Sequence, residues 1–286
     1  MKENYRKIAW KKSAPFFIVH AIGLIGPFVV GISWTSVVVC LLLYYVRMFF
    51  ITGFYHRYFS HRTFRTSRWF QFAMAFAGTT AAQKGPLWWS AWHREHHKYS
   101  DTLEDVHSAK QHGLWWSHAG WILCDKYHHT KKKFVGDFKR FPELWWLEEH
   151  YLIAPVSLGM ACFVFGAFMY DVWWQGALEM LVVGFFLSTV LLYNGTFAIN
   201  SLAHKVGMKR PDGDDESRNS WILNLITLGE GWHANHHRYP NSEAQAITPV
   251  EKMTDFTHWI LMALHFIGLI RINMQNMQHR IPIGSA

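Results

Sequence analysis

The chain has 286 residues, of which 50% are hydrophobic and 17% are charged, and its formal net charge is +8. This apolar content excludes a disordered chain, and three cysteines are too few, and odd in number, for a disulfide-stapled secreted domain. The positive charge leaves a membrane surface or a nucleic acid as a partner. The mean hydropathy of −0.02 averages apolar blocks with polar segments that contain most of the 19 histidines.

The N-terminal segment is basic and runs into a long apolar block. Its basic residues are Lys2, Arg6, Lys7, Lys11 and Lys12. The block from 14 to 54 is too long for one membrane span of about 20 residues, and Gly31 offers a turn near its middle. We therefore predict two spans, 14–30 and 35–54. The second apolar stretch and the lack of a small-residue cleavage site argue against a signal peptide.

Two further apolar blocks, 151–170 and 177–199, form a second predicted hairpin with a turn at Asp171. The long polar segments are rich in Lys and Arg, which places the termini and both segments on the cytoplasmic side. Uncharged stretches at 69–83 and 259–270 are too short to span and are predicted to be buried or interfacial helices.

The sequence thus predicts an all-α integral membrane protein with one domain over residues 1–286. Four transmembrane helices in two hairpins would carry a cytosolic helical cap, built from 55–150 and 200–286. The cap contains three histidine clusters. They are His56 and His61, then His93, His96 and His97, then His233, His236 and His237.

The spacing of these clusters predicts metal binding. Positions i, i+3 and i+4 share one face of a helix, so each of the last two clusters can direct three imidazoles at one point. His56 and His61 lie about 140° apart on a regular helix, so they require a helix end or a local distortion. The neighbouring carboxylates Glu95 and Glu230 point off the histidine faces.

The number of histidines predicts more than one metal. One zinc site uses about four ligands, so eight histidines indicate at least two ions. Neutral imidazole suits zinc, copper, iron and nickel. A centre rich in imidazole, beside aromatic walls and a membrane, favours oxygen activation on an apolar substrate, although spacing alone does not identify the reaction.

The three clusters resemble those of the membrane fatty acid desaturases, and His-x4-His resembles the Δ9, stearoyl-type branch. A fourth element, Asn200-Ser-Leu-Ala-His204, is similar to the Asn-x-x-x-His of that family. Shorter phrases around Ser100-Asp101 and Asp105-Val-His107 are also similar. The resemblance covers about residues 14–240.

This resemblance implies a non-haem centre of two iron ions and an oxidoreductase that uses O2 and two electrons. Its product would be a cis double bond, at Δ9, in a long-chain saturated acyl substrate. The implied ligands are His56, His61, His93, His96, His97, His204, His233, His236 and His237, with Asn200 acting through a water. Trp89 matches a tryptophan of the family's acyl tunnel, and Trp88 is a second candidate for substrate binding.

The carrier of the acyl chain stays open between acyl-CoA, an acyl-lipid and acyl carrier protein. Ala91 and Asp125 stand where the animal acyl-CoA enzymes carry arginines, whereas Lys84 and Lys126 could serve a phosphate. The chain shows no redox module of its own, so we expect a separate donor of the ferredoxin, rubredoxin or cytochrome b5 type with its reductase. The compact length favours a multi-pass protein of a bacterial inner membrane.

Three other functions compete with a desaturase. A di-iron hydroxylase or ketolase acting on a lipid chain uses the same scaffold, but His-x4-His together with Asn200 and His204 favours desaturation. A metal carrier or transporter should place its histidines within the spans, whereas these flank the spans. A nucleic-acid partner is not expected, because the basic residues are dispersed beside membrane segments without a binding motif.

Overall fold

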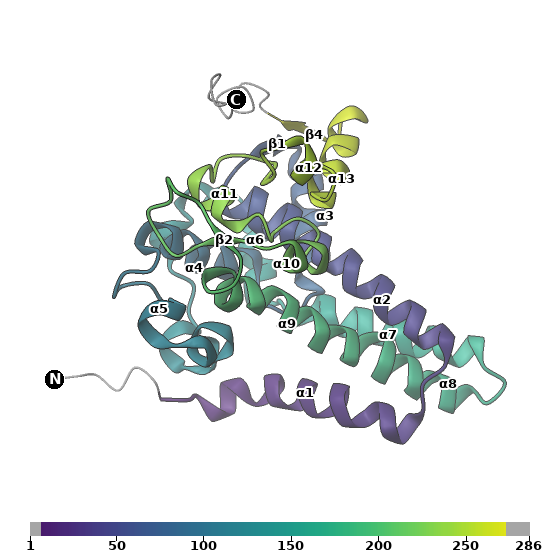
Figure 1. The fold of residues 1–286 in the computed structure, drawn as a ribbon. Coiled ribbons are helices and arrows are strands. Elements are labelled where there is room, and N and C mark those ends of the chain that lie inside the picture. Colours follow the sequence, from purple (N-terminus) through teal and green to yellow (C-terminus); the bar gives the residue numbers. More distant parts are fainter. Residues whose placement is uncertain (1–6, 273–286) are drawn as a thin grey trace.

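Long apolar helices form one half of the molecule, and short helices joined by loops form the other half, the cap (Figure 1). The computed structural model describes residues 7–272. Lys2, Arg6 and the last part of the predicted cap, 273–286, lie outside this range. The bundle comprises α1 (Trp10–Val30), α2 (Trp34–Phe49), the π-helix η1 (Phe50–Ser60), α7 (Ile153–Met169), α8 (Trp173–Glu179), the π-helix η7 (Met180–Leu187) and α9 (Ser188–Ser201).

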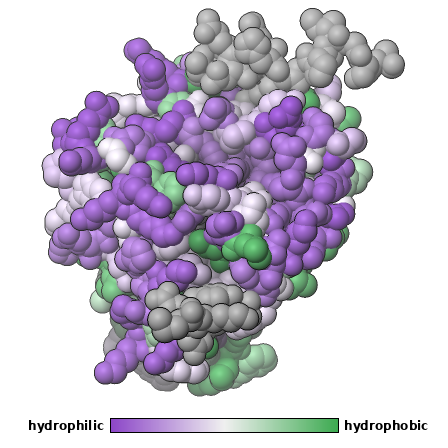
Figure 2. Space-filling model, turned by 90° about the vertical axis from the view of Figure 1, so that its left-hand side faces the viewer, coloured by the Kyte–Doolittle hydropathy of each residue, from purple (hydrophilic) through white to green (hydrophobic). Residues whose placement is uncertain are grey.

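The cap takes its helices from between and after these spans. Its α-helices are α3 (Arg68–Thr79), α4 (Pro86–Tyr99), α5 (Ala109–His112), α6 (Pro142–Glu149), α10 (Trp221–Ile226), α11 (His233–Arg238), α12 (Pro249–Lys252) and α13 (Phe256–Phe266). Its short π- and 3₁₀-helices are η2 (Trp116–Gly120), η3 (Trp121–Leu123), η4 (Asp125–Tyr127), η5 (Lys132–Phe134), η6 (Gly136–Phe138) and η8 (Leu202–His204). Figure 2 shows that the end of the molecule formed by the cap is mostly hydrophilic.

The first predicted hairpin is present, and its turn is where the sequence indicated. Helix α1 ends at Gly31, whose φ of 85° suits glycine. Ser33 then caps α2, because its hydroxyl accepts a hydrogen bond from the Ser36 N–H at 3.2 Å.

The second helix is longer than predicted. Together α2 and η1 run without a break from Trp34 to Ser60, whereas the apolar block ended at 54. The extension carries Arg57, which is buried and ion-paired with Glu230 at 3.1 Å and Asp255 at 2.9 Å. A paired arginine can stay inside the protein, so charge content alone misplaced the end of this helix.

The second hairpin also follows the prediction in outline. Helix α7 ends at Met169, and the next helix begins at Trp173, a few residues before the predicted 177, and continues to His204. The two hairpin turns touch, since Glu179 accepts a hydrogen bond from the Ser33 N–H at 2.7 Å. This contact holds the ends of both hairpins together away from the cap (Figure 1).

Within residues 7–272, three helices are long and apolar enough to cross a membrane, or four if the bent pair α6 and α7, with a 63° break, counts as one span. The short helices predicted near 69–83 and 259–270 correspond to α3, with 12 residues, and α13, with 11. Neither reaches the length of a span, as predicted.

Two small antiparallel sheets fix loops of the cap. Strand β1 (Phe64–Thr66) pairs with β4 (Ile270–Ile272), which ties the end of the described chain to the segment after η1. Strand β2 (Met208–Lys209) pairs with β3 (Arg218–Asn219) and closes the loop that follows His204. This second sheet positions the loop residues described below.

Candidate metal centre and substrate cavity

Five histidines from three separate elements converge in the cap. One ring nitrogen of each lies within 4.8 Å of those of the others. The five are His56, His61, His93, His97 and His236. They come from η1 and its end, from α4 and from α11, so the fold brings together parts of all three predicted clusters.

The distortion predicted for His56 and His61 is a π-helix. Helix η1 spans Phe50–Ser60, and the His61 N–H donates to the His56 carbonyl, five residues back, at 3.2 Å. The wider turn of a π-helix places residues i and i+5 on one side. The unusual spacing of the first cluster is therefore matched by an unusual helix.

Four more histidines form a second group beside the first. They are His96, His204, His233 and His237, again with ring nitrogens within 4.8 Å of one another. The groups are in contact, because the rings of His97 and His237 stack at 4.4 Å. All nine predicted histidines thus belong to one of two adjoining groups.

The ring nitrogens fit metal ions. Several Nε2 atoms face each other directly, at 3.0 Å between His56 and His236 and at 3.1 Å between His204 and His233. On His56 and His204 a carboxylate lies at Nδ1, which holds the proton there and leaves a lone pair at Nε2. Lone pairs directed into a buried space are what a cation between the rings would use.

The protonation states suit the same role. Burial, together with the neighbouring imidazoles, lowers the pKa of His61, His93 and His97 well below the ordinary value. These rings are therefore neutral at neutral pH, and neutral imidazole is the form that binds metal.

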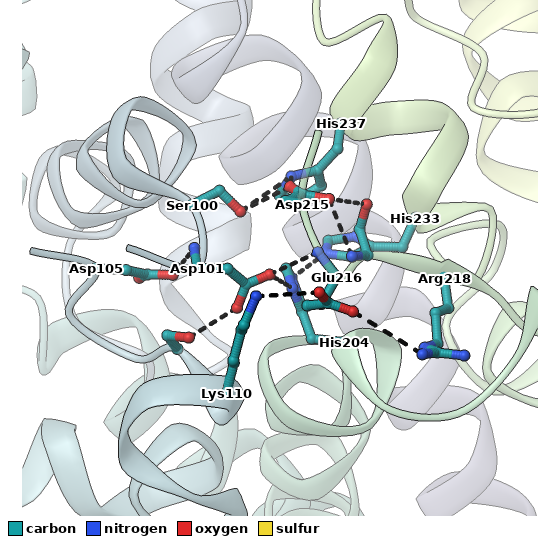
Figure 3. A network of polar contacts seen from close by, with 12 residues as sticks. Ser100, Asp101, Asp105, Lys110, His204, Asp215, Glu216, Arg218, His233 and His237 are labelled. Atoms are coloured by element: carbon teal, nitrogen blue, oxygen red, sulfur yellow. Dashed lines mark hydrogen bonds and ion pairs between the residues drawn. The ribbon is translucent and has the colours of Figure 1, made fainter. Parts of the chain in front are cut away.

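Carboxylates contact the Nδ1 atoms of four of these rings, those of His56, His96, His204 and His237. Asp105 lies 3.0 Å from His96 Nδ1, Asp101 lies 2.8 Å from His204 Nδ1, and Asp215 lies 2.5 Å from His237 Nδ1. Figure 3 shows Asp101, Asp105 and Asp215 around this second group of rings. Burial alone would raise the pKa of Asp101, but the hydrogen bond and charge of His204 lower it. These carboxylates are ionised and fix the orientation of their rings.

Glu230 was predicted to point off the histidine face, and that expectation is wrong. Its carboxylate contacts His56 Nδ1 and the guanidinium of Arg57, and both lower its pKa against the effect of burial. Glu95 behaves as predicted, since it pairs with Lys131. The difference arises because His56 belongs to another helix, which a single-helix projection cannot take into account.

Sequence reasoning missed Asp215 as a partner and did not include His107 among the implied ligands. Asp215 lies in an irregular loop between β2 and β3, where no spacing signal exists. His107 stacks on His96 at 4.2 Å and forms a third group with His96 and Asp105. The resemblance of the Asp105-Val-His107 phrase was the only available signal for His107.

An apolar cavity of about 570 Å³ reaches the histidines. Trp88, Trp89, His93, Thr196 and Asn200 are among its lining residues. The Trp89 ring stacks on His93 at 5.0 Å, and the Trp88 ring stacks on Trp121 at 5.7 Å. Both tryptophans predicted to bind substrate therefore lie on the wall of this cavity.

A hydrogen-bonded chain shapes the wall next to the histidines. Gln83 donates to Thr196 Oγ1 at 3.0 Å and accepts from Trp89 Nε1 at 3.3 Å. A second cavity of about 30 Å³, which is room for about one water, touches His56, His233 and Asn200. The predicted position of Asn200, beside both histidine groups, is consistent with this arrangement.

Comparisons with known proteins agree with the geometry. The family model described as fatty acid desaturase matches residues 32–272. A protein named sn-2 palmitoyl-lipid 9-desaturase, from Nostoc sp. (strain 36), is 32% identical over 94% of this chain and 91% of its own. An sn-1 stearoyl-lipid 9-desaturase from Anabaena variabilis is 32% identical over 92% and 93%. Delta-9 acyl-lipid desaturase 2 from Arabidopsis thaliana is 30% identical over 98% and 88%.

Proposed function

Because the chain belongs to the fatty acid desaturase family, we propose that it inserts a cis double bond at Δ9 into a saturated acyl chain carried by a membrane lipid. The names of its relatives support both the position and the lipid carrier. The single observation that carries the proposal is the apolar cavity, which ends on the histidine rings.

We propose two iron ions as the cofactor. The five-histidine group would hold one ion, and the four-histidine group the other, with Asn200 acting through a water. Iron bound there supplies the redox chemistry in which O2 accepts two electrons from a donor and two from the acyl chain. With two protons taken up, the products are one carbon–carbon double bond and two waters.

The residues of the chain perform the remaining tasks. Asp101, Asp105 and Asp215 hold the rings in the orientation and tautomer that metal binding needs. Trp89 and Thr196 present a rigid wall that fixes which carbons lie beside the histidines, a positioning task. The surrounding apolar wall excludes water from the reacting carbons.

Four spans, with the cap and the histidines on the cytoplasmic side of a bacterial inner membrane, remain our proposal for topology. Helix α7 supplies the fourth span, with α6 of the cap bent away from it by 63°, and the basic residues of the cap support its side. Electrons would come from a separate acidic donor protein of the ferredoxin, rubredoxin or cytochrome b5 type, which the net charge of +8 favours.

Expression in a strain that requires unsaturated fatty acids tests the proposal. We expect growth without supplement and Δ9-unsaturated chains in the membrane lipids, located by mass spectrometry. The matched His96→Ala variant should give neither, because it removes a ring of the second group. Hydroxylated chains without new double bonds would instead assign the chain to the hydroxylases.

A further inference from the structure

The cavity that reaches the histidines continues far into the bundle. Leu181 and Asn200 both line it. They are 19 residues apart on one continuous helix, which corresponds to about 28 Å. The histidines are at the Asn200 end, so the Leu181 end lies well away from the metal centre.

This far end is open to the lipid side. Val156 and Met160 of α7 line it and are 64% and 61% exposed. Phe16 and Val19 of α1 line the cavity nearer the Asn200 end, where the Phe16 ring stacks on Tyr193 at 5.8 Å. Farther along, α1 packs closely on the bundle, since a Cβ on Gly23 would meet Val190 at 2.7 Å. The groove is therefore lined by the first halves of α1 and α7.

A basic region lies between the two ends. The Tyr193 hydroxyl donates to the Ala82 carbonyl at 2.8 Å, which fixes the turn that carries Lys84 between Asn200 and Leu181. Lys84 and Lys12 both line the cavity, and Lys12 pairs with the Asp125 carboxylate at 2.5 Å. The Lys84 ammonium lies 4.7 Å from the Trp88 ring centre and contacts the Nδ1 atom and the carbonyl of His128 at 3.0 and 2.9 Å. These partners are neutral, so Lys84 is the lysine of this region whose charge can meet an anion.

We propose that the cavity binds an intact diacyl phospholipid taken directly from the bilayer. One acyl chain passes Trp89 to the histidines, the phosphate lies at Lys84, and the second acyl chain occupies the groove between α1 and α7. This inference rests on the proposed function and adds how the lipid is recognised. A chain on a single thioester carrier would leave the groove empty.

Photo-crosslinking tests the groove without turnover. The probe is phosphatidylglycerol with a diazirine near the end of one acyl chain, in vesicles that contain the full protein. We expect labelled peptides from both α4 and α7. Gly159→Leu should cut α7 labelling about tenfold, because Gly159 lies within the cavity and its Cβ would already meet the Phe185 ring at 3.4 Å.

Ala161→Leu is the matched control, since Ala161 is on the exposed face of the same helix and should label like the wild type. Equal α7 labelling in both variants would mean ordinary boundary lipid and would overturn the proposal. If Gly159→Leu does not fold, the wild type still tests the groove, because labelled peptides are expected from both α4 and α7.

A charge variant tests the phosphate site. The wild type should bind the phosphatidylglycerol probe about tenfold better than a matched diacylglycerol probe, and Lys84→Met should remove this preference. Lys139→Met, on the exposed surface, should retain it. Equal binding of both probes by the wild type would overturn the phosphate assignment.

Desaturation in cells tests the groove and the proposed function separately. If Gly159→Leu produces as much unsaturated phospholipid as Ala161→Leu, the groove is not used, while the proposed function stands. If the wild type produces none, the proposed function fails, whatever the probes label.

Discussion

At the scale of single residues, the centre depends on groups behind the rings as much as on the rings. Asp215 accepts from Ser100 at 2.7 Å and from the Ser217 N–H at 2.9 Å, and it pairs with His237. The carboxylate is therefore held from several sides, and it holds His237 in turn. Such partners typically contribute 10–100-fold to metal affinity or activity.

Asp215→Asn tests this role. The amide keeps the size of the side chain but removes the charge that stabilises the His237 N–H, so we expect iron affinity and desaturation to fall about 10–100-fold. Iron per chain, measured after dialysis against graded chelator, checks the effect. Asp212→Asn is the control, because Asp212 is 46% exposed and pairs with Arg210 instead. Equal iron retention by both variants would contradict the assignment.

Thr196 offers a second test at this scale. Thr196→Val keeps the shape but removes the hydrogen bond from Gln83, which also holds Trp89. We expect full iron content, a several-fold lower rate and double bonds spread over neighbouring positions, since the wall that positions the chain becomes looser. Mass spectrometry of the products measures the spread, and an unchanged single position would exclude this role.

At the scale of elements, the π-helix η1 is the feature on which the first histidine group depends. Insertion of an alanine after Tyr58 should place the two histidines six residues apart, which turns His61 away from His56 by about 120° on an α-helix. The five-histidine group would lose a ring, so we expect bound iron to fall by about half and activity to disappear.

Tyr58→Phe is the control for that insertion. It removes the hydrogen bond from the Tyr58 hydroxyl to Gln71 at 2.8 Å, leaves the spacing unchanged and should keep both ions. Full iron content after the insertion would show that the spacing of His56 and His61 is not essential.

The elements also show which features could be predicted from sequence. Histidines three and four residues apart share a helix face whatever surrounds them, so the rings of the last two clusters could be grouped from spacing, whereas His204 was implied only by the resemblance to a family. The partners of these rings could not be predicted, because Asp215 reaches His237 from a loop closed by β2 and β3. The end of η1 was misplaced because the buried charge of Arg57 is compensated by Glu230 and Asp255, which are distant in sequence.

At the scale of the whole molecule, the two hairpins give the protein opposite ends. Ser33, Tyr170 and Glu179 join the hairpin turns at one end, and the histidines lie in the cap at the other. Substrate and electrons must therefore reach the centre from the cap side or from the membrane between the helices. The proposed topology places both turns across the membrane from the cap.

Single-cysteine labelling in oriented vesicles tests this arrangement. Cys40, Cys124 and Cys162 are buried, so background labelling should be low. Ile32→Cys and Gln175→Cys, in or beside the two turns, should react with an impermeant maleimide only from the side opposite the cap, since both positions are exposed. Leu103→Cys, 78% exposed on the cap at the wild-type residue, should react only from the cap side. If Gln175→Cys reacts from the same side as Leu103→Cys, then α7 and the helix from Trp173 to His204 do not form two full spans.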